Sequence, residues 1–149
     1  MYRTTPDLDL GIEYNPLDDA LDPLVNYRLV GETEGAPAVI LGTSSDRIGT
    51  PGGQAYYVTA SKSLQHETGL PIAPYAGISY GSYDEKADPI GGLNVRYSEA
   101  WSSTHLCDGH NLHHMLNLDL GEGRPTLGLL LVHLRGYHLG FNVAFSFDF

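Results

Sequence analysis

The chain carries very little positive charge. Lysine occurs only at Lys62 and Lys86, Lys and Arg together number 8, and the formal net charge at pH 7 is -10. Nucleic acids and anionic lipid surfaces are bound by clustered Lys and Arg, so this composition argues against both as partners. Charged residues of either sign make up 17% of the chain, below the quarter or so that is usual in soluble domains. Such a composition is unfavourable for a surface that faces water everywhere.

Long apolar runs and cysteine pairs are also missing. No apolar run approaches the roughly 18 residues of a transmembrane helix, so any passage through a membrane would have to use strands. Cys107 is the single cysteine, and it cannot form an internal disulfide. The opening residues show no secretory leader. We expect one domain over residues 1–149, or the C-terminal part of a longer barrel.

The last thirteen residues show the clearest pattern in the chain. The even positions are small or polar. Every odd position is apolar or aromatic: Tyr137, Leu139, Phe141, Val143, Phe145, Phe147 and Phe149. Successive side chains of a strand point to opposite faces, so this alternation predicts a strand with one wholly apolar face. A closing strand that ends on Phe is typical of bacterial outer-membrane β-barrels. We therefore expect this strand to face lipid and to act as an assembly signal.

Similar alternation recurs along the chain and predicts an all-β fold. Turn residues separate about ten strands, and no segment is a convincing helix. This is the arrangement of an antiparallel meander or up-and-down β-barrel. The expected strands are Asp7–Tyr14, Leu24–Val30, Ala38–Thr43, Gln54–Leu64, Ile72–Tyr83, Gly92–Ser98, Trp101–Cys107, Leu112–Leu120, Thr126–Arg135 and Tyr137–Phe149. The segment Asp84–Pro89 is expected to separate the fifth strand from the sixth.

Alternation alone does not say which face points outward, and three hypotheses follow from it. The non-apolar face carries Gly, Asn, Ala and Ser, which suits a narrow lumen better than a water-facing surface. The first hypothesis is a non-catalytic barrel of the outer membrane that contacts lipid or detergent. The second is a soluble barrel with its apolar face turned inward around an apolar ligand. The third is a subunit that packs its aromatic face on a partner in a larger assembly.

A family resemblance supports the first hypothesis. The segments 37–42 (PAVILG), 46–50 (DRIGT), 56–62 (YYVTASK) and 77–81 (GISYG) form a strand–loop–strand block. This block resembles one in YjbH-like outer-membrane proteins associated with exopolysaccharide production. The resemblance covers about half of the chain and rests on structural rather than catalytic motifs. It implies a β-barrel of the bacterial cell envelope, with polysaccharide or other envelope proteins as partners.

A histidine-rich hairpin is the main candidate for a metal site. His105, Cys107, His110 and His113 surround an Asp108-Gly109 turn signal, and imidazole and thiolate are good ligands for zinc or copper. A two-residue turn would bring side chains of the two strands together. His113 and its neighbour His114 must point to opposite faces, so at most one of them joins a given site. The alternative is a polar hairpin rim that binds no metal and leaves the chain without a cofactor.

A second candidate is the turn-rich loop around Asp46, Arg47 and Gly49. Either the two charged residues hold the loop at a barrel mouth, or Asp46 bonds to the backbone of its own turn while glycines supply unusual backbone angles. We favour the second interpretation. Catalytic motifs such as Gly-x-Ser-x-Gly and His-Glu-x-x-His do not occur in the sequence, and we therefore expect no enzyme.

Overall fold

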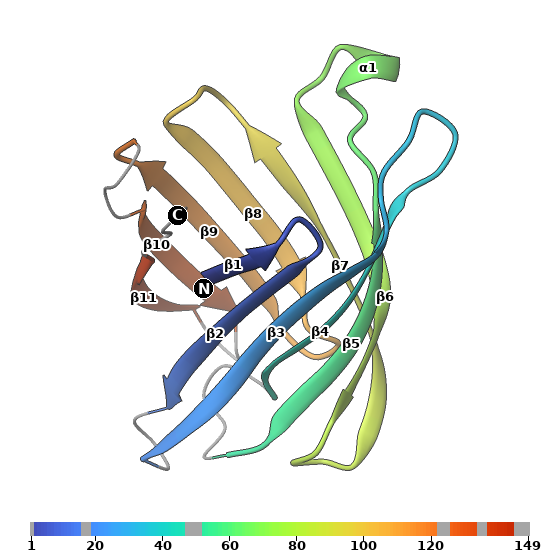
Figure 1. Cartoon of the computed structure of the whole chain (residues 1–149). Coiled ribbons are helices and arrows are strands. Elements are labelled where there is room, and N and C mark those ends of the chain that lie inside the picture. The colour runs from blue at the N-terminus through green and yellow to red at the C-terminus, as the bar shows by residue number, and fades with distance from the viewer. Residues whose placement is uncertain (1, 16–18, 47–51, 122–125, 134–136, 145–149) are drawn as a thin grey trace.

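The computed structural model describes residues 2–15, 19–46, 52–121, 126–133 and 137–144. It is a single antiparallel sheet in which each strand pairs with the next along the chain (Figure 1). The strands are β1 (Tyr2–Thr5), β2 (Leu8–Asn15), β3 (Ala20–Val30), β4 (Ala38–Ser45), β5 (Gln54–Ser61), β6 (Ile72–Gly81), β7 (Lys86–Arg96), β8 (Trp101–Cys107), β9 (Leu112–Asp119), β10 (Thr126–His133) and β11 (Tyr137–Ala144). The all-β antiparallel meander is therefore confirmed.

Three details differ from the expected strands. β1 adds a short strand before the first expected one, and β3 begins at Ala20 rather than Leu24. β7 begins at Lys86, so the expected break after β6 includes Asp84 and Glu85 but does not extend to Pro89. Pro89 lies within the pairing of β6 with β7, opposite Ile78. A proline removes one backbone donor from the ladder, and the neighbouring pairs hold the two strands in register.

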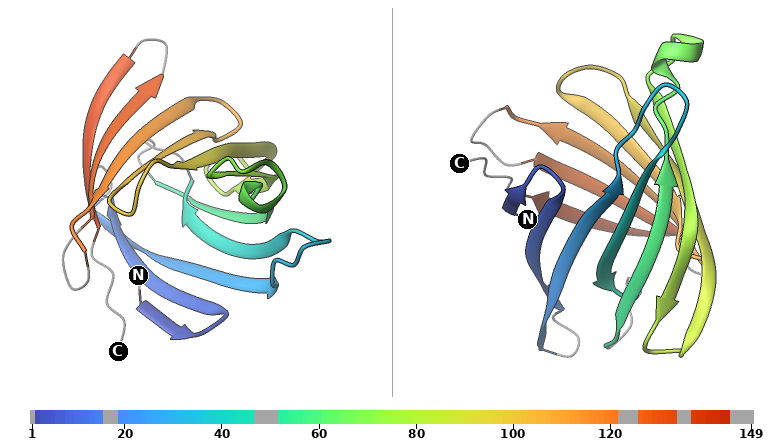
Figure 2. Two further views of the ribbon diagram at one scale, coloured as in Figure 1. Left: turned by 90° about the horizontal axis from the view of Figure 1, so that it is seen from above. Right: turned by 45° about the vertical axis from the view of Figure 1, so that its right-hand side comes forward.

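The sheet curls into a trough that remains open. Figure 2 shows, from above, the strands curving around a central space, with a gap between the first and last strands. In the described residues no pairing joins β11 to β1 or β2, so the expected closed barrel is not what the structure has. A four-residue helix, α1 (Gln65–Thr68), follows β5 and ends at Gly69 in a left-handed conformation.

Register assigns every described side chain of the strands to one of two faces. Leu10 pairs with Val25, and Asp9 with Asn26, so apolar residues of β2 and β3 share one face and polar residues share the other. The same separation continues through Leu41 opposite Val58 on the apolar face. Residues on the same face as Asp9 and Asn26, from β2 through to Leu106 of β8, line one common cavity, which identifies their face as the concave one. The apolar face is therefore the convex, outer face.

Candidate functional site

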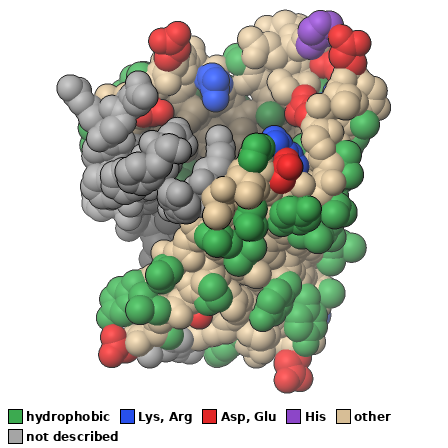
Figure 3. Space-filling model, viewed as in Figure 1, with side chains coloured by type: hydrophobic (Ala, Val, Ile, Leu, Met, Phe, Trp, Pro, Cys, Tyr) green, Lys and Arg blue, Asp and Glu red, His purple; other side chains and the backbone are tan. Residues whose placement is uncertain are grey.

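The outer face is a broad band of exposed apolar side chains. Among the described residues only Ala38 and Ala55 are fully buried apolar residues, because a single curled sheet has no second layer to cover it. Ile78, in the middle of β6, is 57% exposed. Figure 3 shows apolar side chains spread over the outside of the sheet. Exposed members of the band are Leu10, Ile12, Tyr14, Leu21, Tyr27, Leu41, Tyr56, Val58, Ile78, Tyr80, Trp101, Leu116, Leu127 and Leu129.

The inner face forms a cavity of about 440 Å³ that polar, aromatic and aliphatic side chains line together. Tyr57 reaches across it and donates a hydrogen bond from its hydroxyl to Asn26 Oδ1. Gly42 lies between these two residues in the ladder, and a Cβ there would collide with the Tyr57 ring. Asp9, Tyr75 and other inner-face residues complete the lining. Ile40 and Leu106 also line it, so the cavity offers a ligand both polar and apolar contacts.

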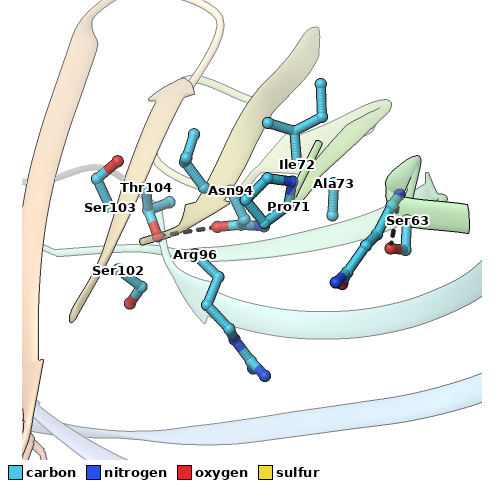
Figure 4. Close-up of a pocket in the computed structure, with 11 residues that line it drawn as sticks. Ser63, Pro71, Ile72, Ala73, Asn94, Arg96, Ser102, Ser103 and Thr104 are labelled. Atoms are coloured by element: carbon cyan, nitrogen blue, oxygen red, sulfur yellow. Dashed lines mark hydrogen bonds between the residues drawn. The ribbon is translucent and has the colours of Figure 1, made fainter. Parts of the chain in front are cut away.

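A second cavity of about 450 Å³ lies at one end of the trough. Figure 4 shows Arg96 extending from β7, and Asn94 bonded to Thr104 of β8. The Thr104 hydroxyl donates to Asn94 Oδ1 at 2.8 Å. Ser102 and Ser103 point to opposite sides of β8 in this view, as their positions in the ladder require.

The turn between β8 and β9 is built around Asp108. Its Oδ1 accepts hydrogen bonds from the backbone N–H groups of His110 at 2.9 Å and Asn111 at 2.7 Å, and its Oδ2 lies 2.7 Å from His113 Nε2. Burial raises the pKa of Asp108, but the hydrogen bond from His113, the two backbone donors and the charge of His113 outweigh burial and hold that pKa well below its usual value. His110 makes a separate contact, from Nε2 to Asp88 Oδ2 at 2.7 Å.

A chain of four polar side chains crosses the outer face of β8 and β9 and ends at Tyr97 in the turn after β7. His105 of β8 lies directly opposite His114 of β9, and their Nδ1 atoms are 2.8 Å apart. The other nitrogen of His105, Nε2, lies 3.1 Å from Ser103 Oγ. Ser103 Oγ lies 2.9 Å from the Tyr97 hydroxyl. Ser103 is only 4% exposed although it belongs to the outer face.

The four expected metal ligands are not brought together. His105 lies on the outer face with His114, whereas His113 lies on the inner face opposite Leu106. His110 belongs to the turn, and Cys107 is a half-buried free thiol opposite Leu112. Within the described ranges no group of three or more His, Cys, Asp or Glu side chains could hold a metal. The expectation that His113 and His114 face opposite ways agrees with the register.

The expected loop residues are described only in part. Asp46 Oδ2 accepts a hydrogen bond from the backbone N–H of Tyr83 at 2.6 Å, and Asp46 N–H donates to the Gly53 carbonyl at 3.1 Å. Asp46 therefore links its loop to the turn after β6; the expected bonds to its own turn involve residues 47–51, which lie outside the described residues. Gly53 has a φ of +104°. Arg47 and Gly49 lie outside the described residues.

The terminal strand is likewise described in part. The backbone of Tyr137, Leu139, Phe141 and Val143 belongs to β11, where register pairs Phe141 with Leu129 of the outer face. Phe145, Phe147 and Phe149 lie outside the described residues. The lipid-facing role expected of this strand remains a prediction.

Sequence reasoning missed several residues that make the polar contacts described above. Ser103, Tyr97 and the acceptor roles of Asp108 and Asp88 were not among the expected site residues. The Ser103-Thr-His105 spacing was a usable signal, because residues two apart on a strand share a face. Asp88 of β7 contacts His110 in the turn after β8, and Tyr97 in the turn after β7 contacts Ser103 of β8. No local motif indicates either contact.

Comparisons with known proteins add no family to these observations. No family model, curated protein or solved structure matches the chain. In the described part of the chain, no helix has the length and hydropathy needed to span a bilayer.

Proposed function

We propose that the chain is a wall element of an outer-membrane-type β-barrel, a component of the bacterial cell envelope. The observation that carries the proposal is the direction of the two faces. Large apolar side chains cover the convex face, whereas the concave face mixes Asp, Asn, Ser, Thr and Tyr side chains with a few apolar ones. Contiguous exposed apolar surface marks contact with a membrane or another protein. Membrane barrels have an apolar outside and a polar inside, the reverse of a soluble barrel.

The open edges are relevant to this proposal. An unpaired strand edge in lipid leaves backbone N–H and C=O groups without partners, each at a cost of several kcal/mol. Insertion therefore requires the two ends of the sheet to pair. The exopolysaccharide association implied by the family resemblance rests on the quoted motifs alone and remains a prediction.

The other two hypotheses make different demands on the same surface. A soluble barrel with an apolar ligand requires the large apolar residues to turn inward, and the exposure of Leu10, Val58 and Ile78 on the outer face argues against it. A subunit in a protein assembly would also cover the outer band. That hypothesis agrees with the exposed apolar side chains. The solubility and flotation experiments below distinguish it from the membrane barrel.

A matched pair of substitutions on β6 tests the proposal. Ile78→Lys places a charge on the outer face, and Ser79→Lys places the same charge on the inner cavity lining one residue later. We expect Ile78→Lys to destabilise the inserted protein by about 2–4 kcal/mol, and Ser79→Lys to have a much smaller effect. Vesicle flotation and denaturant unfolding in phospholipid vesicles measure the two effects.

Solubility separates the hypotheses further. The proposal requires detergent for a monodisperse preparation and flotation of the wild-type chain with vesicles. A wild-type chain that is folded and monodisperse in plain buffer would contradict it. A chain that needs detergent and yet fails to float with vesicles would favour the protein assembly.

A further inference from the structure

The four-residue chain on the outer face has the geometry of a hydrolytic site. We propose that Ser103 is a nucleophile, His105 its general base and His114 the positioning residue, and that together they hydrolyse carboxylic esters bearing an acyl chain. This activity goes beyond the wall function proposed above, which includes no chemistry. The chemistry does not require the sheet to be inserted in a membrane.

One assignment of protons satisfies every distance in the chain. If His105 carries its proton on Nδ1, it donates to His114 Nδ1 across 2.8 Å. His105 Nε2 then has a free lone pair 3.1 Å from Ser103 Oγ and accepts the serine proton. The Tyr97 hydroxyl completes the series by donating to Ser103 Oγ at 2.9 Å. A nucleophile bonded to a base that is oriented by a third group is the arrangement of serine hydrolases.

The sheet fixes these groups in place. Ser103 and His105 are two residues apart on β8 and therefore share a face. His114 faces His105 directly across the β8–β9 ladder. Because neighbouring strands are held by backbone hydrogen bonds, the relative positions of the three side chains depend little on flexible loops. Preorganisation of this kind is what a nucleophile and its base need.

Apolar neighbours define the class of substrate. In the two ladders that flank β8, Ser103 lies opposite Val95 of β7 and Leu116 of β9. Leu116 is exposed on the outer band. An acyl chain bound along this face would cover apolar surface and bring its ester carbonyl to Ser103. The substrate is therefore an acyl ester, either a membrane lipid or a free ester in solution.

Tyr97 controls access to the nucleophile. Ser103 is 4% exposed, whereas Tyr97, which bonds to it from the turn after β7, is 61% exposed. A side chain with so little burial can turn away without disrupting a core. When it does, Ser103 Oγ is uncovered and the ester carbonyl can reach it.

The reaction balances without any cofactor. Ser103 Oγ attacks the ester carbonyl carbon, and its proton passes to His105 Nε2. The carbon–oxygen bond to the alcohol breaks, and His105 returns the proton to the departing alkoxide. Water then attacks the acyl-serine, gives one proton to His105, and releases the carboxylic acid. That proton returns to Ser103 Oγ, which restores the starting state.

A matched serine pair tests the nucleophile. The full chain is purified in detergent and assayed with p-nitrophenyl butyrate and p-nitrophenyl decanoate. Ser103→Ala is expected to lower the hydrolysis rate at least about 100-fold. Ser102→Ala, the same change one residue earlier on the inner face, is expected to leave the rate within about twofold. Equal rates for wild type and Ser103→Ala would overturn the proposal.

A covalent probe keeps the test valid if a variant fails to fold. An alkyl fluorophosphonate reacts with an activated serine, forming an Oγ–P bond and releasing fluoride. In folded wild-type protein, mass spectrometry is expected to place the label on Ser103. Tyr97→Ala is expected to accelerate labelling by uncovering Ser103. Folded protein that hydrolyses neither ester and carries no label at Ser103, in the wild type and in Tyr97→Ala, would refute the proposal.

The positioning role of His114 has its own readout. Asn at position 114 keeps an acceptor for the Nδ1 proton of His105, whereas Leu does not. We expect His114→Asn to retain at least about tenfold more activity than His114→Leu, in variants with equal thermal stability. Equal activity in the two variants would remove His114 from the site, because a packing role alone does not distinguish an acceptor from an apolar side chain.

Phospholipid vesicles identify the source of the ester. Release of fatty acid from phosphatidylethanolamine vesicles would make the substrate a membrane lipid, and hydrolysis of the p-nitrophenyl esters alone would make it a free ester. The two proposals also fail separately. Ester hydrolysis by a chain that does not float with vesicles removes the membrane wall and supports the site. Flotation without hydrolysis or labelling removes the site alone.

Discussion

Replacing Asp108 by Asn should destabilise the β8–β9 hairpin more than any exposed carboxylate change. The Asp108 side chain is 16% exposed and accepts three hydrogen bonds, two from turn N–H groups and one from His113. Asn keeps an oxygen for the two turn donors. It turns an amide NH₂ toward His113 Nε2 in place of the carboxylate oxygen, so the bond between the two side chains is the part that changes.

The magnitude follows from the burial of His113. This side chain is 1% exposed, and its Nδ1 atom has no hydrogen-bond partner in the described part of the chain. His113 therefore has no alternative to Asp108 there. A hydrogen bond to a charged group contributes about 1.5–3 kcal/mol, and we expect Asp108→Asn to lower the free energy of unfolding by about 2 kcal/mol. Asp108→Ala removes all three bonds and should lower it by about 4 kcal/mol.

The effect should depend on pH in a defined direction. The pKa of Asp108 is lowered in the folded chain, whereas an unfolded Asp titrates near about 3.9. A lowered folded-state pKa contributes stability above the unfolded value, and that stability is lost as the pH falls toward the folded value. The stability difference between wild type and Asp108→Asn should thus be full at pH 7 and shrink progressively below about pH 4.

Trp101 supplies the assay, because it is the only tryptophan and opens the strand that leads to Asp108. Its fluorescence during urea unfolding in detergent gives midpoints and slopes. Glu99→Gln, a change at an exposed carboxylate in the preceding turn, serves as the control and should remain within about 0.5 kcal/mol of wild type. An Asp108→Asn variant equal to that control, or a difference that does not shrink in acid, would refute the reasoning.

Two further predictions concern backbone packing and surface charge. A Cβ at Gly77 would lie 2.0 Å from the Val58 carbonyl oxygen, so Gly77→Ala should lower the free energy of unfolding by about 2–3 kcal/mol. Gly31 has open space around it, so Gly31→Ala should leave stability unchanged in the same unfolding assay. Arg28 and Asp7 form a 2.8 Å ion pair between exposed side chains, so Arg28→Ala should cost at most about 1 kcal/mol, and a larger loss would show that its bond to the Pro6 carbonyl matters.

Alternation of apolar and polar residues was sufficient to predict the meander and its faces, because a period of two maps directly onto the two sides of a strand. Proline positions were the main source of error. Pro23 and Pro89 lie inside β3 and β7, where the rule that places proline at edges predicts a loop. In β3 the Pro23 carbonyl accepts bonds from the side chains of Thr43 and Gln54, support that no local pattern reveals.

The expected metal ligands are kept apart by the length of the turn. A two-residue turn at Asp108-Gly109 would pair Cys107 with His110 and place both on one face with His105. The structure has a four-residue connection instead, in which Cys107 pairs with Leu112 and His105 with His114. The side-chain bonds from Asp108 to the N–H groups of His110 and Asn111 stabilise this longer turn. The same change of register that separates the metal ligands aligns His105 with His114.

Closure of the sheet depends on strand number rather than on any residue pattern. In an antiparallel meander of eleven strands the first and last run in the same direction, so β1 and β11 could pair only as parallel neighbours. β2 runs antiparallel to β11, and β1 pairs with β2 only as far as Leu10. The edge of β2 beyond Leu10 is thus the antiparallel partner that the chain itself offers to β11. If the apolar outer face meets lipid, where unpaired backbone groups are costly, this pairing would yield a barrel of ten strands with β1 lying outside the closed ladder.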